Sequence, residues 1–452
     1  MPYEGEYAQY RSIKRIAESP RIKDLLGRCQ IRNPDSDQFT PPKIINRSDL
    51  PASTWTPEWI IAVDGSHQEV PMKNGFPGAE AAYVTVASVV LNVARMVELD
   101  QVRPVDPRDF RRIEQADTID SAFPGCNVII KGETTAEGSL RRALHETLSN
   151  VRMIESGESL LDTFEALLDL KPKTEKQHCP YNDCQEPQQL FQRGKGNYAC
   201  SCPLKKVLFS TDSLRIHEGM DPAGSNGAMY AEIMQVLERT WLIHILRTIE
   251  RNNWLSSLKR IAFIMDGPLA VFGHPAWLSQ AFTHELSRIN KLAKEKNGDD
   301  ILLVGIEKTG MFVDHLLSLD RHPDGTPGKL AAGSICLLDD NYIKRNVIFS
   351  DSTKVYGQDT YFGRKFFYKT SSGAFVVASV PLLNDKQKIL TTAESDQFNR
   401  LSDSVNLLDR LVSSRYPNSL APLISAHAEA AIPMNLGSRV LEKIARELVA
   451  KA

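Results

Sequence analysis

Two aspartates follow apolar runs of the same form in this 452-residue chain. The run 59–63 leads into Asp64-Gly65, and the run 261–265 leads into Asp266-Gly267. Each run is too short for a typical helix and predicts a buried strand that stops at its Asp-Gly pair. A carboxylate at the end of a buried strand sits on a rigid element facing a crevice, where metal-dependent phosphodiester chemistry needs it. The alternative is that each Asp-Gly pair only begins a turn, but two pairs of matching form favour a site.

Two aspartates alone are compatible with several chemistries. A pepsin-like pair needs Asp followed by Thr or Ser and then Gly, and a haloacid-dehalogenase-type phosphotransferase needs a second Asp two residues after the first. The chain has Ser66 and Pro268 at those later positions, and it contains no Walker A sequence for ATP hydrolysis. Metal-assisted hydrolysis remains, in which Mg²⁺ or Mn²⁺ takes one or two carboxylates together with phosphate oxygens of the substrate.

A third acid for such a site is expected on the long helix predicted from Gly227 to Asn252. Glu238 lies three residues before Trp241, within an otherwise apolar stripe where an unpaired charge is costly. Glu232 and Glu250 have more polar neighbours and are expected at the periphery of the helix. We therefore predict Glu238 as the metal ligand, with a surface or salt-bridged side chain as the alternative.

Two further segments carry cations that could contact a phosphate. The apolar run 301–306 ends at Glu307-Lys308, and Lys308 could hold a phosphate oxygen or stabilise developing charge; otherwise it is a solvated loop lysine. The segment 356–366 interleaves aromatic residues with Arg364 and Lys365, as in a single-stranded nucleic-acid track. It could equally be an edge strand with an exposed polar face.

Four of the seven cysteines cluster in a polar segment, 171–206, that interrupts the surrounding pattern. Two closely spaced pairs of thiols on two tight turns can close a tetrahedral zinc site, so the segment has the form of a small zinc ribbon. His178 could replace one thiol, and an unmetallated polar insertion is the alternative. An odd number of cysteines without a secretory signal argues against a disulfide framework. The clustered residues are Cys179, Cys184, Cys200 and Cys202.

The elements that must position these residues form a mixed α/β arrangement. Strands alternate with helices in the middle of the chain, and hairpins are expected at both ends, including one through Asn74-Gly75. We divide the chain into an N-terminal helical extension, 1–50, and one catalytic domain, 51–452, that contains the insertion. Further strands are predicted at 83–91, 334–338, 361–368 and 373–380, and further helices at 134–170, 276–296 and 437–450.

The composition is that of an ordinary globular protein, with 42% hydrophobic and 24% charged residues. No apolar run approaches the ~18 residues of a membrane span, and the N-terminus lacks the layout of a signal peptide. We therefore expect a cytoplasmic protein without a membrane partner. The formal net charge is −2, so DNA binding must come from a local basic surface or from a partner.

The ordered set of motifs resembles the NurA nuclease family over about residues 58–445. That resemblance implies an RNase H-like mixed central sheet flanked by helices, and a Mn²⁺-dependent 5′-to-3′ exonuclease with single-strand endonuclease activity. It also implies a homodimer that docks on a hexameric HerA translocase, which feeds it DNA. The similar motifs are 63–66, the acidic helix around Glu238, 265–269, 305–309, 361–366 and Ala426-His427.

The resemblance also assigns roles to individual residues. Asp64 and Asp266 match the metal-binding aspartates, and Glu238 matches the acid between them. Lys308 matches the strand-exit lysine, Tyr361 the late tyrosine and His427 the late histidine. By chemistry alone His427 is a lone packed or surface histidine, whereas the resemblance makes it a metal ligand or proton carrier. Ser66, Arg364 and Lys365 are expected to contact the substrate.

The leading hypothesis is a two-metal DNA nuclease, with Mn²⁺ or Mg²⁺, that works with a HerA-type translocase in DNA end processing or phage defence. A catalytically inert DNA-binding or scaffold subunit of a translocase complex is the alternative, and a phosphatase or nucleotide hydrolase is a third hypothesis. The cysteine-rich insertion is not expected in archaeal NurA proteins, so we interpret it as a partner or DNA contact with a structural zinc, in a bacterial family member.

Overall fold

The chain divides into two compact units, Met1–Pro41 and Pro42–Ala452, which are described separately in this computed structural model. The first unit contains two helices, α1 (Arg11–Glu18) and α2 (Pro20–Arg28). The boundary lies earlier than predicted, because a strand that begins at Lys43 already belongs to the main sheet of the second unit. The structure describes residues 11–29, 41–73, 78–94, 114–172, 176–181, 183–184, 188–189, 191, 197–322, 324–412, 420–431, 440–444 and 446.

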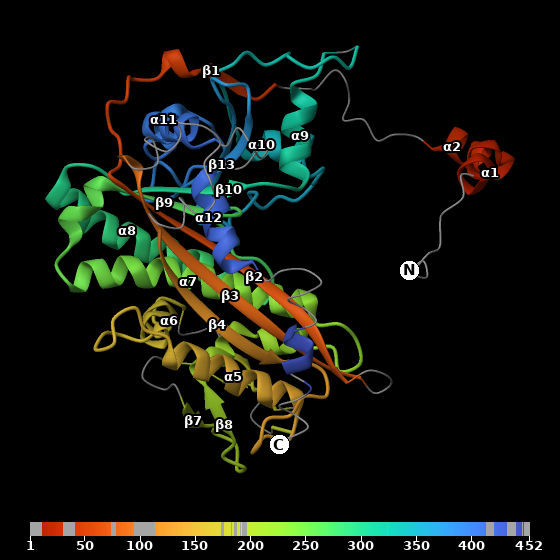
Figure 1. The fold of residues 1–452 in the computed structure, drawn as a ribbon, viewed down its shortest axis with the longest axis vertical. Coiled ribbons are helices and arrows are strands. Elements are labelled where there is room, and N and C mark those ends of the chain that lie inside the picture. The colour runs from red at the N-terminus through yellow and green to blue at the C-terminus, as the bar shows by residue number, and fades with distance from the viewer. Residues whose placement is uncertain are drawn as a thin grey trace. The chain divides into compact units, whose positions relative to one another are not determined.

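A nine-stranded sheet runs through the second unit in the order β1-β11-β12-β13-β10-β9-β2-β3-β4 (Figure 1). β9 pairs in parallel with both β10 and β2, and every other neighbouring pair is antiparallel. The parallel pairing of these three strands therefore ends in one region of the sheet, near Val63, Asp266 and Ile306. The strands are β1 (Lys43–Asn46), β2 (Trp59–Lys73), β3 (Ala79–Asn92), β4 (Glu114–Pro124), β9 (Ile261–Asp266), β10 (Leu302–Glu307), β11 (Ser334–Leu337), β12 (Gly363–Lys369) and β13 (Phe375–Pro381).

The prediction that the first strand stops at Asp64 is wrong. β2 continues to Lys73, because it keeps its antiparallel pairing with β3 beyond Asp64. Its parallel pairing with β9 ends at Val63, which lies opposite Met265. Asp64 therefore lies where the parallel ladder ends and the longer β2–β3 ribbon goes on.

Helices cover both faces of the sheet, which confirms the predicted mixed α/β sheet flanked by helices. On β2, Ile61 packs with one set of helices and Ile60 with another, as expected when successive side chains of a strand point to opposite faces. α9 and α10 pack against the β11–β13 part of the sheet. The first set is α5 (Ala136–Asn150), α6 (Leu160–Leu168), α7 (Gly227–Arg251) and α8 (Leu278–Asn297); the second is α11 (Leu401–Leu411) and α12 (Ala421–Ala430); the third is α9 (Met311–Leu319) and α10 (Asp340–Asn346).

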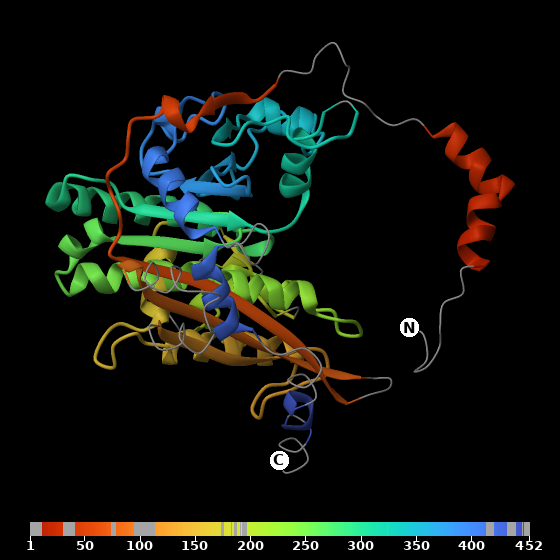
Figure 2. The same cartoon turned by 45° about the horizontal axis from the view of Figure 1, so that its top comes forward.

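Two of these helices bracket the ends of the parallel strands. α7 packs on β2 and β3 from one face, and α12 packs on the same two strands from the other (Figures 1 and 2). Sixteen residues of α7 are buried, among them Glu238 and Arg239, so this helix is a core element with charges in its middle. The end of the parallel ladder thus lies between two helices that can add functional side chains.

The predicted helix 134–170 is two helices, because separate N-caps start each of them. Thr135 caps α5 by accepting a hydrogen bond from the Gly138 N–H, and Ser159 forms a capping box with Asp162 at the start of α6. The hairpin predicted through Asn74-Gly75 and most of the helix predicted at 437–450 lie outside the described residues. Within the described part of the chain, no helix is both long and apolar enough to cross a membrane.

Candidate active site

Four of the predicted site residues meet at the end of the parallel ladder. The Lys308 ammonium, just after β10, lies 2.7 Å from Asp266 Oδ1 and 3.5 Å from Asp64 Oδ2. His427, on α12, places Nδ1 3.2 Å from Asp64 Oδ2. Residues separated by more than 350 positions in the sequence are thereby joined in one polar cluster. Its centre is a pair of carboxylates bridged by a cation.

Burial and mutual repulsion set the electrostatics of the two aspartates. Asp64 is 1% exposed, whereas the Asp266 side chain keeps about a third of its surface. Burial, followed by the nearby Asp64 carboxylate, raises the pKa of Asp266 above its ordinary value, and Lys308 opposes that shift. A hydrogen bond to Asp64 raises the pKa of His427 above its ordinary value. Two close carboxylates with an accessible edge are the hard oxygen ligands that Mg²⁺ and Mn²⁺ prefer, so the donor set fits such an ion.

Glu238 reaches the same strand from the opposite face of the sheet. Its side chain is buried, and its Oε1 would lie only 2.6 Å from a Cβ atom at Gly65, the residue after Asp64. Gly65 thus allows the carboxylate to approach the strand beside Asp64. Glu238 forms an ion pair with Arg239, and the ligand atoms of Asp64, Asp266 and Glu238 do not all lie within 4.8 Å of one another. The predicted third acid is adjacent to the pair without closing a compact ligand group.

Arg239 is a site residue that the sequence reasoning missed. Its buried guanidinium donates hydrogen bonds to the backbone carbonyls of Asp266, at 3.2 Å, and Pro268, at 3.3 Å. Burial lowers the pKa of Arg239 to about 10, an effect opposed by Asp266 and Asp64. Gly267 between the two carbonyls has φ 74°, a conformation suited to glycine. The available signal was the adjacent Glu238-Arg239 pair, because two neighbouring charges in the middle of an apolar helix require buried partners.

Of the other predicted site residues, Ser66 lies near the carboxylate cluster and Tyr361 is buried in the core. Ser66 lies two positions after Asp64 on β2, so it shares that face of the strand and is partly exposed. Tyr361 is buried, and its hydroxyl shares a 2.8 Å hydrogen bond with Tyr356. Burial raises the pKa of Tyr361 above its ordinary value. The Phe362 N–H donates to the Leu269 carbonyl at 2.9 Å, so the Tyr361 segment supports the loop after Asp266.

The burial of Arg364 and Lys365 disagrees with the predicted DNA track. β12 lies between β11 and β13, and the two side chains are 3% and 4% exposed. The Arg364 guanidinium donates to backbone carbonyls, including that of Thr392 at 2.7 Å. The Lys365 ammonium lies 2.6 Å from Glu307 Oε1 and 3.6 Å from the Phe312 ring centre. Their charges are satisfied inside the protein, so neither side chain is presented to a bound strand.

The cysteine cluster forms a second group of ligand atoms. Cys200 Sγ lies 3.8 Å from Cys179 Sγ and 3.4 Å from Cys184 Sγ, and the three sulfurs all lie within 4.8 Å of one another. They are close enough to share one metal ion, and the predicted small cysteine-rich insertion is confirmed. Its short strands are β5 (Gln177–His178), β6 (Gln188–Gln189), β7 (Asn197–Ala199) and β8 (Val207–Phe209).

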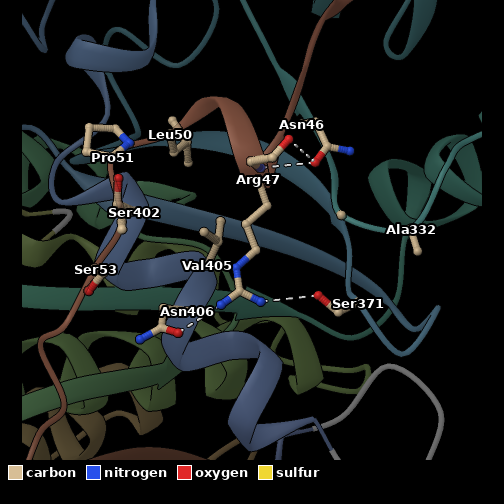
Figure 3. Close-up of a pocket in the computed structure, with 13 residues that line it drawn as sticks. Asn46, Arg47, Leu50, Pro51, Ser53, Ala332, Ser371, Ser402, Val405 and Asn406 are labelled. Carbon is tan, nitrogen blue, oxygen red and sulfur yellow. Dashed lines mark hydrogen bonds between the residues drawn. The ribbon is translucent and has the colours of Figure 1, made fainter.

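A polar hollow elsewhere in the second unit contains no uncompensated charge. It is lined by the segment after β1, the turn after β12 and helix α11 (Figure 3). Arg47, its only cationic lining residue, pairs with Asp409 and donates to Asn406 Oδ1 at 2.9 Å and to Ser371 Oγ at 3.2 Å. We assign it no function.

The sequence matches the family model described as NurA domain over residues 58–432. The chain belongs to the NurA family. The match covers the strands and helices that carry Asp64, Glu238, Asp266, Lys308 and His427. Family membership supports a nuclease.

Two solved NurA structures are similar over their whole length but at low levels. The crystal structure of the NurA nuclease from Sulfolobus solfataricus has 10% sequence identity and a TM-score of 0.36, covering 99% of each chain. A second crystal structure of NurA has 11% identity and a TM-score of 0.30, covering 97% of each chain. A search of curated proteins finds no significant match. At these levels of similarity, the family assignment rests on the family model alone.

Proposed function

We propose that this NurA-family chain is a metal-dependent deoxyribonuclease that hydrolyses DNA phosphodiesters by a two-metal mechanism. The observation that carries the proposal is the Asp64–Lys308–Asp266 cluster, which lies where the parallel pairing of β2, β9 and β10 ends. The cluster lies inside the region matched by the family model. Cleavage is expected to be 5′-to-3′ exonucleolytic, with endonuclease activity on single strands.

Asp64, Asp266 and Glu238 would hold the ions, Mn²⁺ in preference or Mg²⁺. Such ions, when bound, supply an activated water and stabilise the leaving oxygen. Two buried carboxylates that repel each other provide a physical reason for cation binding, because a divalent cation offsets the repulsion that raises the pKa of Asp266. Glu238 would have to exchange its Arg239 partner, at least in part, to join them.

The other side chains of the cluster would act on the substrate and on protons. Lys308 is 26% exposed, so its ammonium can turn from the two aspartates toward a phosphate oxygen as negative charge develops there. His427 is more than half exposed and hydrogen-bonded to Asp64, so it can hold a proton at Nδ1 or release it near the reacting group. Arg239 is a positioning residue, since it binds the backbone carbonyls of Asp266 and Pro268.

DNA delivery would fall to a partner, a HerA-type hexameric translocase, with the nuclease acting as a homodimer. The formal net charge of −2 supports delivery by a motor, because bulk charge would not hold DNA on this chain. The burial of Arg364 and Lys365 removes the basic track that the sequence suggested, which adds to that support. DNA end processing and phage defence would require the same chemistry.

The test is cleavage of linear single- and double-stranded DNA, labelled at either the 5′ or the 3′ end, with Mn²⁺, Mg²⁺ or EDTA. Wild type, Asp64→Asn and Asp266→Asn are compared with Asp385→Asn, a matched change at a fully exposed aspartate. Each protein is assayed with and without a HerA hexamer from the same source. We expect metal-dependent cleavage by wild type and Asp385→Asn, and its loss in the two cluster variants.

Absence of cleavage by wild type under every condition, including with the translocase, would reject the nuclease. The alternative of an inert DNA-binding or scaffold subunit would then replace it. Hydrolysis confined to nucleotides or other small phosphoesters would instead favour a phosphatase or nucleotide hydrolase.

A further inference from the structure

The four clustered cysteines lie on two short hairpin segments outside the carboxylate cluster. Cys179 directly follows β5, with Cys184 five residues later, and Cys200 directly follows β7. Cys202 lies in the connection from β7 to β8, where the Cys200 N–H donates to the Lys206 carbonyl at 2.7 Å and the Lys205 N–H donates to the Cys202 carbonyl at 3.0 Å. Two chain segments thus each bring two thiols to one place through tight backbone turns.

The spacing of the sulfur atoms fits a shared metal ion and excludes a disulfide bond. Cys200 Sγ lies 3.4 Å from Cys184 Sγ and 3.8 Å from Cys179 Sγ, whereas a disulfide requires about 2.05 Å. Four thiolates at about 2.3 Å from a tetrahedral Zn²⁺ lie about 3.8 Å from one another. The observed separations are therefore those of neighbouring corners in such a tetrahedron.

Burial and position favour Cys202 over His178 as the fourth ligand of such an ion. The Cys202 side chain is fully buried and lies two residues after Cys200 in the same turn, beside the group of three close sulfur atoms formed by Cys179, Cys184 and Cys200. His178 is exposed on β5, so its ring has no need of a partner inside the insertion. The alternative of a histidine ligand, which the sequence leaves open, is therefore not favoured.

We propose that Cys179, Cys184, Cys200 and Cys202 hold one structural Zn²⁺, which makes the insertion a zinc-dependent folding unit on the nuclease. The physical need for the ion is clear, because the strands of the insertion contain only two or three residues each. A segment of fewer than about 40 residues rarely buries enough apolar surface to fold without a metal or a covalent crosslink. No ligand of this site belongs to the carboxylate cluster, so the zinc has no part in the hydrolysis.

The side chain of Arg141, which also forms a buried ion pair with Asp212, attaches this unit to the core. Arg141, on α5, donates from Nε to Asp212 Oδ1 at 2.8 Å and from a terminal nitrogen to Asp212 Oδ2 at 2.7 Å. The same guanidinium donates to the Val207 carbonyl of β8 at 3.1 Å and lies 4.6 Å from the centre of the Tyr181 ring. Arg141 thus contacts both cysteine-bearing segments, and ordering by zinc places Tyr181 and Val207 where this single side chain can bind them.

The test is the metal content of the purified full-length chain, measured by inductively coupled plasma mass spectrometry after dialysis against EDTA. We expect one zinc per chain in wild type and in Cys336→Ser, the matched control at a buried cysteine of β11. Cys200→Ser and Cys202→Ser should lose at least nine-tenths of the zinc. Limited proteolysis of these two variants should cut within residues 176–209, while the wild-type chain resists.

Two measurements on the wild-type chain test the zinc site even if the cysteine variants misfold. A mercurial reagent that reacts with thiols should release one equivalent of zinc into a colorimetric chelator. Cobalt exchanged into the site should give the visible spectrum of a tetrahedral tetrathiolate complex. A wild-type chain without zinc, a site filled by iron, a disulfide among the four cysteines in non-reduced peptides, or full zinc retention in Cys200→Ser and Cys202→Ser would each overturn the proposal. None of these results depends on DNA cleavage, so the nuclease and the zinc site can fail separately.

Discussion

The carboxylate cluster and the cysteine cluster each gather like side chains in one place, but the protein supports them differently. Asp64 and Asp266 stand on adjacent strands in the middle of a nine-stranded sheet, and Lys308 lies between their carboxylates. The cysteines lie in the turns beside strands of two or three residues, and Cys200 Sγ lies 3.4 Å from Cys184 Sγ. The first group is held by the fold, whereas the second needs a ligand to hold its own segment.

This difference predicts how firmly each group would keep a metal. In the carboxylate cluster Lys308, Arg239 and His427 already balance the negative charges, so an ion can leave without unfolding the site. In the cysteine cluster three sulfur atoms lie within 4.8 Å of one another, and the ion would itself be the crosslink. We therefore expect the carboxylate cluster to exchange its catalytic metal readily and the cysteine cluster to retain its structural metal.

Metal removal gives the largest expected contrast between the two clusters. Dialysis against EDTA should abolish DNA cleavage completely, and added Mn²⁺ should restore it, because the sheet holds the aspartates in place without the ion. The same dialysis should leave one zinc per chain, measured by mass spectrometry. Loss of the zinc together with the activity would contradict the expected difference, because both sites would then exchange their metals equally readily.

Replacement of Asp266 by Asn should lower the rate of DNA cleavage at least about 10³-fold, because a metal ion contributes several kcal/mol of charge stabilisation. The melting temperature should stay level or rise, since the substitution removes the repulsion with Asp64 that raises the pKa of Asp266. Steady-state cleavage and calorimetry measure the two effects. A variant that melts far below wild type would show that Asp266 holds the fold rather than the metal.

Replacement of Lys308 by Met should lower cleavage by about 10²- to 10³-fold, the usual cost of losing one donor to a developing oxyanion. The methionine keeps most of the length of the side chain and removes the ammonium group. Lys388→Met, at a half-exposed lysine of the surface, is the control. Unchanged cleavage in Lys308→Met would mean that this lysine only neutralises the aspartates.

Replacement of His427 by Gln should have the smallest effect on cleavage, about 10- to 100-fold, because the ring is more than half exposed and acts beside Asp64. The pKa of His427 in metal-free protein should lie above its ordinary value and fall back in Asp64→Asn. Because the folded-state pKa is raised, the ion pair stabilises the fold below the ordinary histidine pKa and is lost as pH rises through the raised value. Histidine ring resonances in an NMR titration measure this directly, and an unchanged pKa in Asp64→Asn would refute the contact.

The three strands that carry the cluster were predictable because short apolar runs are a strong local signal. Asp64, Asp266 and Lys308 each follow such a run, and parallel pairing alone was then enough to bring them together. The spacing of Cys200 and Cys202 was similarly informative, since thiols so close in sequence have few other arrangements.

Long-range pairing was not predictable from local patterns. The continuation of β2 beyond Asp64 depends on its partner β3, and the burial of Arg364 depends on backbone carbonyls that come from residues 387–392. The role of Arg239 beside Asp266 was missed because it depends on hydrogen bonds to main-chain oxygens, which leave no trace in the sequence. The alternation of aromatic residues and cations in 356–366 favoured a DNA-binding surface. The same pattern also suits a central strand whose cations bind carbonyl and carboxylate groups inside the protein.

Gly65 is a position at which this site tolerates no larger residue without a structural change. A methyl group at this position would fall 2.6 Å from Glu238 Oε1 and 2.9 Å from Met234 Cγ, so even alanine must displace the buried acid. The close approach of sheet and helix thus depends on the absence of a side chain at Gly65, a residue that carries no charge. Variation at this neutral position should be as harmful to catalysis as variation at the acids themselves, and sequence surveys that score only charged residues would overlook it.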